Sequence, residues 1–229
     1  MTFGEILSDM WKIFIKFYIN KGLLVTGLEY TLMLSAIAVL CGSVIGAILA
    51  IGKRSKFKPL VWLITAFVEI IRGTPALLQL YIGYFIVPML VPFMDLSPFA
   101  CVAVALTINS AAYVSEIIRS GIEAVDKGQT EAARSLGLTP FTTMTKIVLP
   151  QAIKNILPAL GNEFITVIKE TSLASTFFVG ELMTTYQTIK GITFNPIPTL
   201  MDVGVIYFVL TFSLSKLLGS LEGRMKKNA

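Results

Sequence analysis

Long apolar stretches alternate with short polar segments along almost the whole chain. A helix of about 20 residues crosses the ~30 Å hydrocarbon core of a bilayer and satisfies its own backbone hydrogen bonds, as lipid requires. The pattern therefore predicts an all-α membrane protein in which residues 22–229 form one transmembrane domain. We expect five transmembrane helices, at about residues 28–51, 60–91, 99–118, 150–178 and 200–218.

A helical pattern also precedes the first of these stretches. Between residues 3 and 18, apolar side chains recur at helical spacing and charged ones fall elsewhere, which is typical of an amphipathic helix at a membrane surface. The segment 1–21 is therefore predicted to be an interfacial helix at the outer face. A signal peptide is not favoured, because charged residues and Trp11 interrupt the apolar run and no small-residue cleavage site follows.

The first stretch carries a row of small residues. Gly42, Gly46 and Ala50 recur every four residues, on one face of the predicted helix. Small residues at this spacing let the backbone of a neighbouring helix approach closely. We expect a packing role for this row.

The second stretch is too long for one straight crossing and is interrupted by the polar segment 69–75. We expect a discontinuous helix, with Thr74 as the cap of its second half and Pro75 as the first residue. Such a helix start carries roughly half a positive charge near mid-membrane, which suits a substrate carboxylate beside Arg72. The alternative is that Arg72 pairs with Glu69 and that the glycine and proline only kink the helix.

Composition agrees with a membrane location and adds an orientation. The 229 residues are 55% hydrophobic and 14% charged, and the mean hydropathy is +0.76, far above that of a soluble domain. A net charge of +5 could indicate a nucleic-acid partner, but the basic residues gather in the connections 53–58, 119–154 and 216–227. Such an excess marks cytoplasmic connections. We expect no nucleic-acid partner, an outside N-terminus and a cytoplasmic C-terminus.

The residue content also excludes several kinds of membrane enzyme. Histidine is absent, which removes histidine-based zinc, haem and hydrolase sites. Cys41 and Cys101 lie inside apolar stretches, so we expect neither a disulfide nor a metal site. The segment 52–54 does not fit a phosphate-binding loop, so we expect no cofactor in this chain and ATP and Mg bound by a partner. For an enzyme, only Lys169 near Ser172 could form a nucleophile and base pair.

Polar side chains inside the third stretch are candidate functional residues. Polar groups within a membrane are costly and usually face a protein interior or a water-filled path. Asn109, Tyr113 and Glu116 follow one another at helical spacing and share one face of the predicted helix. Arg119 is three residues beyond Glu116 and can pair with it at the cytoplasmic end.

The fourth stretch carries a polar stripe with acidic residues beside it. At roughly 1.5 Å per residue from Gln151, Glu163 lies about 18 Å along the helix, close to the middle of the bilayer. An acid at that depth suits a cationic substrate, although Lys169 could instead neutralise it within the helix. The stripe comprises Asn155, Asn162, Thr166 and Lys169, and the acids on its adjoining edge are Glu163 and Glu170.

The connection at about residues 120–150 contains the most specific motif. Thr130 and Glu131 favour a helix start, alanines extend the helix, and Gly137 ends it. A short helix with one small-residue side, lying along the cytoplasmic face, is suited to a groove in a cytosolic partner. The motif consists of Glu131, Ala132, Ala133, Gly137, Ile147, Leu149 and Pro150.

This spacing resembles the hallmark of permease subunits of ATP-binding-cassette importers. The resemblance spans about residues 22–220 and is closest to the branch that carries polar amino acids, on segments 72–75, 109–113, 128–129 and 169–173. It implies a bacterial-type inner membrane, a second permease subunit, an external solute-binding protein and two ATP-binding subunits. Those subunits would contact a coupling helix at Glu131, Ala132, Ala133 and Gly137. A partner-independent channel is not favoured, because the motif is intact.

The resemblance implies that an amino acid binds within the membrane and moves by alternating access. Arg72 and Thr74 would meet its carboxylate, while Asn109 and Asn162 would supply neutral hydrogen bonds. The mid-membrane acid favours a cationic amino acid such as arginine, lysine or histidine, and a neutral one such as glutamine is the alternative. The candidate substrate-binding residues are Arg72, Thr74, Asn109, Asn162, Glu163, Thr166, Lys169 and Glu170.

Overall fold

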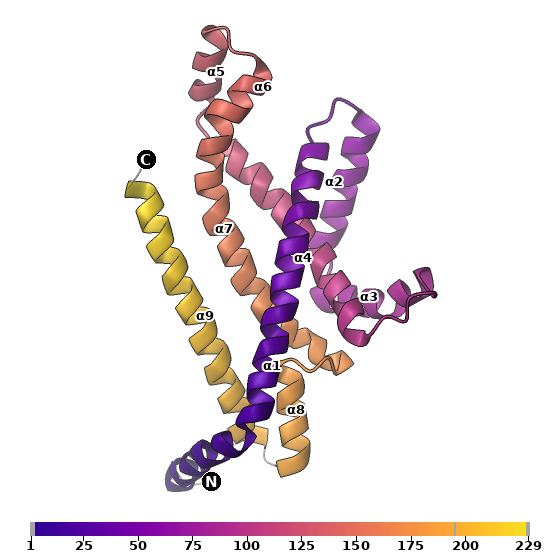
Figure 1. Ribbon diagram of the computed structural model, residues 1–229, viewed down its shortest axis with the longest axis vertical. Coiled ribbons are helices and arrows are strands. Elements are labelled where there is room, and N and C mark those ends of the chain that lie inside the picture. The colour runs from indigo at the N-terminus through magenta and orange to yellow at the C-terminus, as the bar shows by residue number, and fades with distance from the viewer. Residues whose placement is uncertain (1–2, 195, 228–229) are drawn as a thin grey trace.

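The computed structural model describes residues 3–194 and 196–227, which fold almost entirely into helices (Figure 1). No strand occurs within these two ranges, which confirms the predicted all-α class. Two further segments are a π-helix, η1, and a 3₁₀-helix, η2. In chain order the elements are α1 (Phe3–Gly52), α2 (Lys58–Arg72), α3 (Ala76–Leu90), α4 (Pro98–Glu123), α5 (Lys127–Ser135), α6 (Pro140–Thr143), η1 (Met144–Val148), α7 (Leu149–Glu170), η2 (Thr171–Phe177), α8 (Leu182–Thr193) and α9 (Pro196–Lys227).

The first helix is longer than the sequence pattern predicts. Instead of an interfacial helix over 1–21 and a separate transmembrane helix, α1 runs unbroken for 50 residues. No proline occurs before Pro59, so nothing interrupts the backbone hydrogen bonds between the two predicted segments. Such a helix is roughly 75 Å long, more than twice the thickness of a hydrocarbon core. The described side chains begin at Lys21, so the predicted amphipathic face of residues 3–18 lies outside them.

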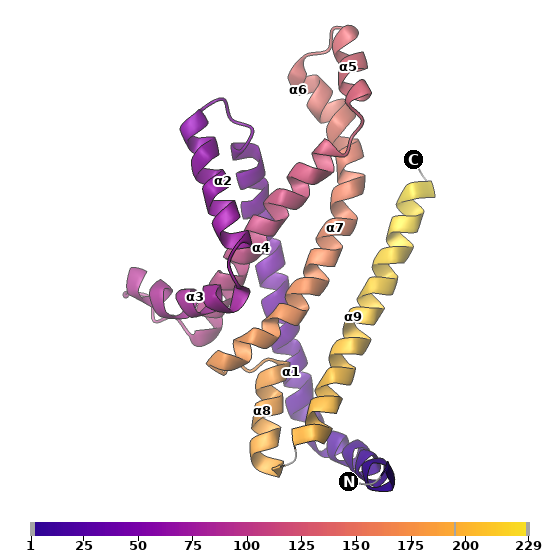
Figure 2. The same ribbon diagram turned by 180° about the vertical axis from the view of Figure 1, so that it is seen from behind.

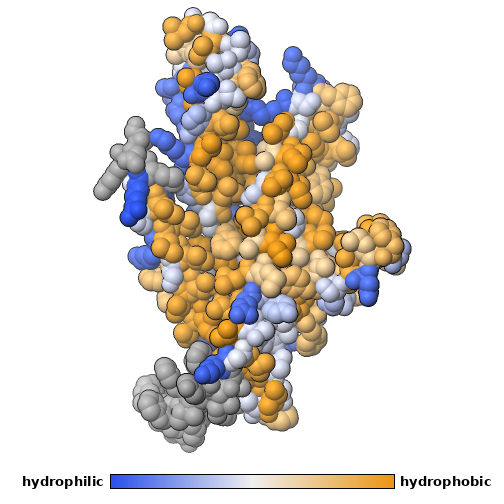
Figure 3. Space-filling view, viewed as in Figure 1, coloured by the Kyte–Doolittle hydropathy of each residue, from blue (hydrophilic) through white to orange (hydrophobic). Residues whose placement is uncertain are grey.

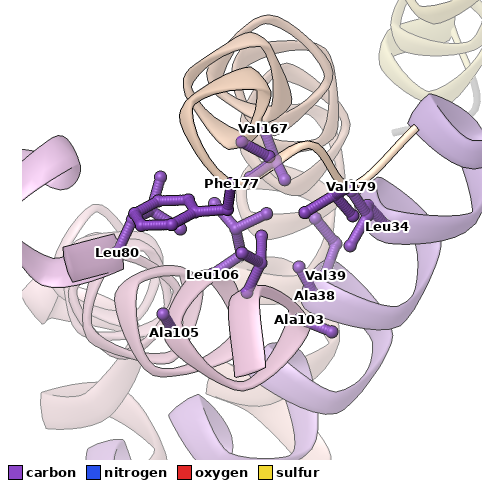
Figure 4. Close-up of a cluster of buried hydrophobic side chains, with 12 residues drawn as sticks. Leu34, Ala38, Val39, Leu80, Ala103, Ala105, Leu106, Val167, Phe177 and Val179 are labelled. Carbon is purple, nitrogen blue, oxygen red and sulfur yellow. The ribbon is translucent and has the colours of Figure 1, made fainter. Parts of the chain in front are cut away.

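Helices α1, α4 and α7 form the centre of the fold (Figures 1 and 2). α4 packs against α1 along much of its length, and α7 contacts both of them. A buried apolar cluster joins this centre to α3 and η2, as Figure 4 shows. Its members include Leu34 and Ala38 of α1, Leu80 of α3, Leu106 of α4, Val167 of α7 and Phe177 of η2.

Small residues bring α1 and α4 close together. A Cβ at Gly46 would lie 2.8 Å from the carbonyl oxygen of Ala111, and one at Gly42 would lie 2.9 Å from the Cβ of Ser110. Ala50 continues the row and is buried. Real Cβ atoms do not approach other atoms so closely, so the contact depends on glycine. The predicted packing role of this row is confirmed.

The second apolar stretch is broken, as predicted. α2 ends at Arg72, α3 begins at Ala76, and the two helices are bent by 110° at the break. This angle exceeds a proline kink in a continuous helix, so the two pieces are separate helices. α3 therefore leaves the direction of α2 and packs against α4 (Figure 2).

Within the described residues, three helices are long and apolar enough to cross a membrane. They are residues 21–52 of α1, the whole of α4, and residues 196–224 of α9, and the bent pair α2 and α3 can add a fourth. α7 has 22 residues but is not among them, since its polar side chains lower its hydropathy. The count of five spans stays a prediction. The expected fourth span over 150–178 is also shorter, because α7 ends at Glu170 and η2 follows.

The middle of the molecular surface is apolar, and hydrophilic side chains gather toward the two ends (Figure 3). α9 contributes large exposed side chains to this middle zone, including Val205, Phe208, Phe212 and Leu217. Only 11% of its most apolar segment is buried inside the chain. An apolar surface of this kind is stable against lipid and unstable against water.

We predict that Gly46→Val destabilises the fold, because the added side chain meets the backbone oxygen of Ala111, which has no room to move. Overpacking of this kind costs about 1–3 kcal/mol. Thermal unfolding of the detergent-solubilised permease measures the loss. Gly204→Val is the matched control, since a Cβ at Gly204 has nothing within 4 Å. Equal unfolding temperatures for the two variants would contradict the prediction.

Candidate functional site

The break between α2 and α3 is capped differently from the prediction. Pro75, not Thr74, occupies the N-cap position of α3, and no side chain caps that helix. The Thr74 hydroxyl turns back and donates to the carbonyl oxygen of Ile70 at 2.8 Å. The last carbonyls of a helix lack backbone partners, and a threonine four residues later can supply one. The predicted N-cap at Thr74 and helix start at Pro75 are therefore wrong.

Gln79 holds the break together from inside α3. Its side-chain Nε2 donates to the carbonyl oxygen of Ile71 at 2.6 Å, and lies 3.1 Å from the carbonyl oxygen and 2.9 Å from the hydroxyl of Thr74. One buried amide thus satisfies backbone groups that the break leaves without helical partners. The sequence prediction missed Gln79, although it is the only amide side chain in an otherwise apolar half-helix.

Asn109 is the partner of Gln79. Its Nδ2 donates to Gln79 Oε1 at 2.8 Å, and the residue is 4% exposed. The candidate amide of Asn109 is therefore engaged with α3. Tyr113 and Glu116, predicted to share its helical face, line a cavity with Arg72 instead. The three residues share one face of α4, as expected. Asn109 meets α3, however, whereas Tyr113 and Glu116 lie nearer the end of α2.

The cavity lies between the end of α2, α4 and α7 and has a volume of about 360 Å³. Arg72 Nη1 is 4.0 Å from Glu116 Oε2 and 3.9 Å from Glu69 Oε1, and the guanidinium lies 5.8 Å from the ring centroid of Tyr113. The ion pair between Arg72 and Glu69, which was the alternative to a role in substrate binding, is present. It is long, and Arg72 lies about as close to a second acid, Glu116. Asn155 lines the cavity from α7.

Glu116 is the centre of a charged cluster, which we call the Glu116 cluster. Lys53, in the connection after α1, places its Nζ 3.5 Å from Glu116 Oε2. Arg119 donates to Glu116 Oε1, as predicted, and also to Glu123 one turn further along α4. The Glu116 side chain is 18% exposed. Its carboxylate thus joins α4 to Arg72 of α2 and to Lys53 in the connection after α1.

Glu163 is buried at the contact between α7 and α4. The residue is 9% exposed, and it interacts electrostatically with Glu170 and with the side chain of Ser110 on α4. The interactions of Glu163 do not include Lys169, which interacts with Glu170.

The rest of the polar stripe on α7 is exposed. Asn162, Thr166 and Lys169 are exposed, and Asn155, although exposed too, lines the cavity with Arg72, while Glu163 is buried. The Thr166 hydroxyl donates to the carbonyl oxygen of Asn162 at 3.1 Å, within the helix. The structure thus separates the candidate residues into the break with Arg72, the buried Glu163 and this exposed stripe.

A short helix, α5, is present over the predicted motif, but it begins earlier than expected, and its coupling role stays a prediction. Asp126 is its N-cap and accepts from the backbone N–H of Gly128 at 2.6 Å, so the helix starts at Lys127 and not near Thr130. The predicted end is confirmed. Gly137 has φ +80°, its N–H donates to Arg134 O, and the N–H of Leu138 donates to Ala133 O. This Schellman arrangement requires the left-handed backbone that glycine adopts freely.

The end of the molecule formed by α5 and α6 exposes apolar side chains outside the bundle (Figure 3). Leu136 is 83% exposed and Phe141 is 77% exposed, whereas Ala133 is buried against the loop. Beneath α5 is a cavity of about 760 Å³ whose polar lining includes Arg54, Glu123, Lys127, Thr130 and Arg134. The predicted return into the membrane over residues 147–150 is helical, since η1 leads directly into α7.

These features define a helical membrane protein with several candidate spans, one broken helix and a short helix exposed at one end. Residues 42–227 match the family described as the binding-protein-dependent transport system inner membrane component. The chain belongs to this family, and within it to the permease subunits of amino-acid ATP-binding-cassette importers.

Several relatives cover nearly the whole chain. The arginine transport system permease protein ArtQ of Bacillus subtilis is 41% identical over 202 residues, which are 88% of this chain and 92% of that protein. The putative glutamine transport system permease protein GlnP of Rickettsia conorii is 40% identical over 219 residues, 96% of this chain and 100% of the relative. A crystal structure of an amino acid ABC transporter with histidines has a TM-score of 0.88 and 43% identity, and covers 92% of this chain and 98% of that chain.

We predict that Gln79→Leu lowers the stability of the permease, because it leaves the Ile71 carbonyl and the Asn109 amide without their partner. A buried polar group left unsatisfied costs about 1–3 kcal/mol. Chemical denaturation in detergent measures the loss, with the exposed Gln129→Leu as control. Because the two amides are bonded, Asn109→Ala should add little further loss in the double variant. Fully additive losses would contradict the proposed bridge.

Proposed function

We propose that this permease translocates cationic amino acids such as arginine, lysine or histidine by alternating access. The strongest support comes from the buried carboxylate of Glu163. Glu163 and Glu170 interact with each other, and Lys169 interacts with Glu170, so the set has one more acid than base. A buried carboxyl favours a cationic side chain, because its ionised form and the cation attract strongly where water is excluded.

A neutral amino acid such as glutamine is the second candidate. The exposed amide of Asn162 and the hydroxyl of Thr166 lie on the adjoining face of α7 and could bond a neutral polar side chain. Relatives of similar identity are named for arginine and for glutamine, so they support both candidates. The charge of Glu163 favours the first.

The exposed polar stripe of α7 supports a second permease subunit, identical or paralogous, beside this one. Polar and charged side chains within a membrane face protein or a water-filled path. Asn162, Thr166 and Lys169 lie on a helix that packs among the spans of this chain, yet point away from it. The substrate path would then lie between the two α7 helices, with an external solute-binding protein delivering the amino acid.

We assign α7 as a membrane span, the fourth in chain order, although it is too polar to be counted by composition. The basic connections after α1 and around α5 lie at the same end of the molecule as the C-terminal end of α9 (Figure 1). The positive-inside rule makes this end cytoplasmic, with the N-terminus outside. The amino-terminal end of α8 packs beside Gly27 of α1, toward the opposite end.

Two ATP-binding subunits would dock on the cytoplasmic end that carries α5 and α6. Glu131 and Ala132 are exposed there, flanked by the apolar side chains of Leu136 and Phe141. Exposed apolar anchors inside a polar rim are typical of protein interfaces. ATP and Mg would be bound by those subunits, and closure of the ATP-binding pair would be transmitted to the membrane spans through α5.

The substrate assignment is tested by Glu163→Gln in proteoliposomes that contain the whole importer. Uptake of labelled arginine and glutamine is measured in competition. We expect the arginine-to-glutamine ratio to fall by about tenfold or more, since one buried charge contact is worth at least ~1.4 kcal/mol. Glu29→Gln, at an exposed position on α1, should leave the ratio unchanged. An unchanged ratio in Glu163→Gln would refute the cationic assignment.

The docking assignment is tested by Phe141→Ser and Glu131→Arg. We expect both to reduce co-purification of the ATP-binding subunits and ATP-driven uptake, while the unfolding temperature of the permease stays the same, because both side chains are exposed. Phe93→Ser is a matched control, since Phe93 is 82% exposed in the connection between α3 and α4. Normal assembly and transport in both docking variants would remove the assignment.

Gly137→Val tests the backbone requirement at the end of the same helix. A Cβ there has nothing within 4 Å, so space does not limit the substitution, but φ +80° is strained for a β-branched residue. We expect a misplaced Leu136 and uptake at least severalfold lower, with membrane insertion intact. Gly191→Val, also with open space around its Cβ, should transport normally. Normal uptake with Val at position 137 would show that the turn is not required.

A further inference from the structure

We propose that the cavity between α2, α4 and α7 is a second amino-acid site, which binds the α-carboxylate and α-ammonium groups. This inference rests on the proposed function, since it concerns the same cargo. The cavity holds about 360 Å³, and its polar lining comprises Arg72, Tyr113, Glu116, Ser120 and Asn155. Small-molecule sites begin at about 300 Å³, so one amino acid fits.

The Arg72 guanidinium has hydrogen-bonding capacity left for a carboxylate. Its ion pairs with Glu69 and Glu116 are 3.9 and 4.0 Å long, beyond the distance of a direct hydrogen bond. The side chain is 34% exposed. The guanidinium carbon of Arg72 lies over the Tyr113 ring, 5.8 Å from its centroid, so an aromatic face holds the group on one side. Arginine binds a carboxylate through two parallel hydrogen bonds.

Glu116 supplies the complementary charge for the ammonium group. Arg119 engages Oε1, while Oε2 has only the longer contacts, 3.5 Å to Lys53 and 4.0 Å to Arg72. The two charged groups that face the cavity thus have opposite sign and stand one ion-pair distance apart. A zwitterion placed between them exchanges a long ion pair for two short ones. The Asn155 amide and the Ser120 hydroxyl can bond the remaining polar atoms.

This site differs from the Glu163 site in position and in what it recognises. Asn155 and Ala159 line the cavity, and Glu163 lies a further turn along α7. The lining has charges for the backbone groups that all amino acids share. Glu163 would therefore select the side chain, while the cavity would hold any amino acid that reaches it. Because it lies next to the cytoplasmic connections, it fits the inner part of the path.

The test measures binding to the permease assembled with its ATP-binding subunits in nanodiscs, without solute-binding protein. Three probes are compared: L-arginine, L-argininamide, which lacks the carboxylate, and Nα-acetyl-L-arginine, which lacks the ammonium charge. We expect the unmodified complex to prefer L-arginine over each analogue by about tenfold or more, the usual worth of a hydrogen bond to a charged group.

The variants should remove these preferences one at a time. Arg72→Gln should abolish the preference over the amide and keep the preference over the acetylated probe, and Glu116→Gln should do the opposite. A variant that only disturbs packing would lower the affinity for all three probes by the same factor. That result would overturn the proposed site. Lys58→Gln, an exposed charge at the start of α2, is the control and should keep both preferences.

The outcome for this site is separable from the outcome for the proposed function. If the importer takes up labelled arginine but Arg72→Gln and Glu116→Gln leave both preferences intact, the second site is refuted and the function stands. Absence of saturable arginine binding to a complex that transports arginine would also refute it. If the importer carries no amino acid at all, the proposed function fails first.

Discussion

The bonding of the Gln79 amide is the interaction on which the rest of the structure depends. A helix broken inside a membrane leaves carbonyl groups that lipid cannot satisfy. Gln79 reaches back to the end of α2 and accepts from Asn109 of α4, so one side chain closes the break and fixes it against the bundle. Because the break is fixed, α2 ends with Arg72 directed at the cavity and not at lipid.

From Arg72, a continuous series of charges leads to the end of the molecule that carries α5 and α6. Arg72 lies beside Glu116, Arg119 donates to both Glu116 and Glu123, and Glu123 lines the cavity beneath α5. These contacts are part-buried at Glu116 and exposed at Glu123. Glu123 is linked to Glu116 through the shared Arg119, and it lines the same cavity as Lys127 and Thr130 of α5. The charged series therefore connects the cavity beside Arg72 with the cavity beneath α5.

The sequence predicted what local pattern determines, and missed what tertiary contact determines. Hydropathy located three candidate spans and the broken pair, the run 69–75 located the break, and Gly137 located the end of α5, since each follows from the chemistry of a few adjacent residues. Thr74 was misassigned because both a cap and a backward hydrogen bond are open to a threonine at a helix end. Gln79 was missed because its partners come from α2 and α4, 8 and 30 residues away.

The polarity of α7 explains why it differs from the three apolar candidate spans and what surroundings it needs. A polar or charged side chain within a membrane is costly unless it faces protein or a water-filled path. Lys169 reduces that cost by its interaction with Glu170, but the amide of Asn162 and the hydroxyl of Thr166 remain exposed on the same helix. α9, by contrast, exposes large apolar side chains along most of its length, with the exposed charges of Lys216 and Arg224 toward its C-terminal end, so its apolar part is stable against lipid without help. The two helices therefore need different surroundings, and only a surface that keeps lipid away from α7 gives the permease both.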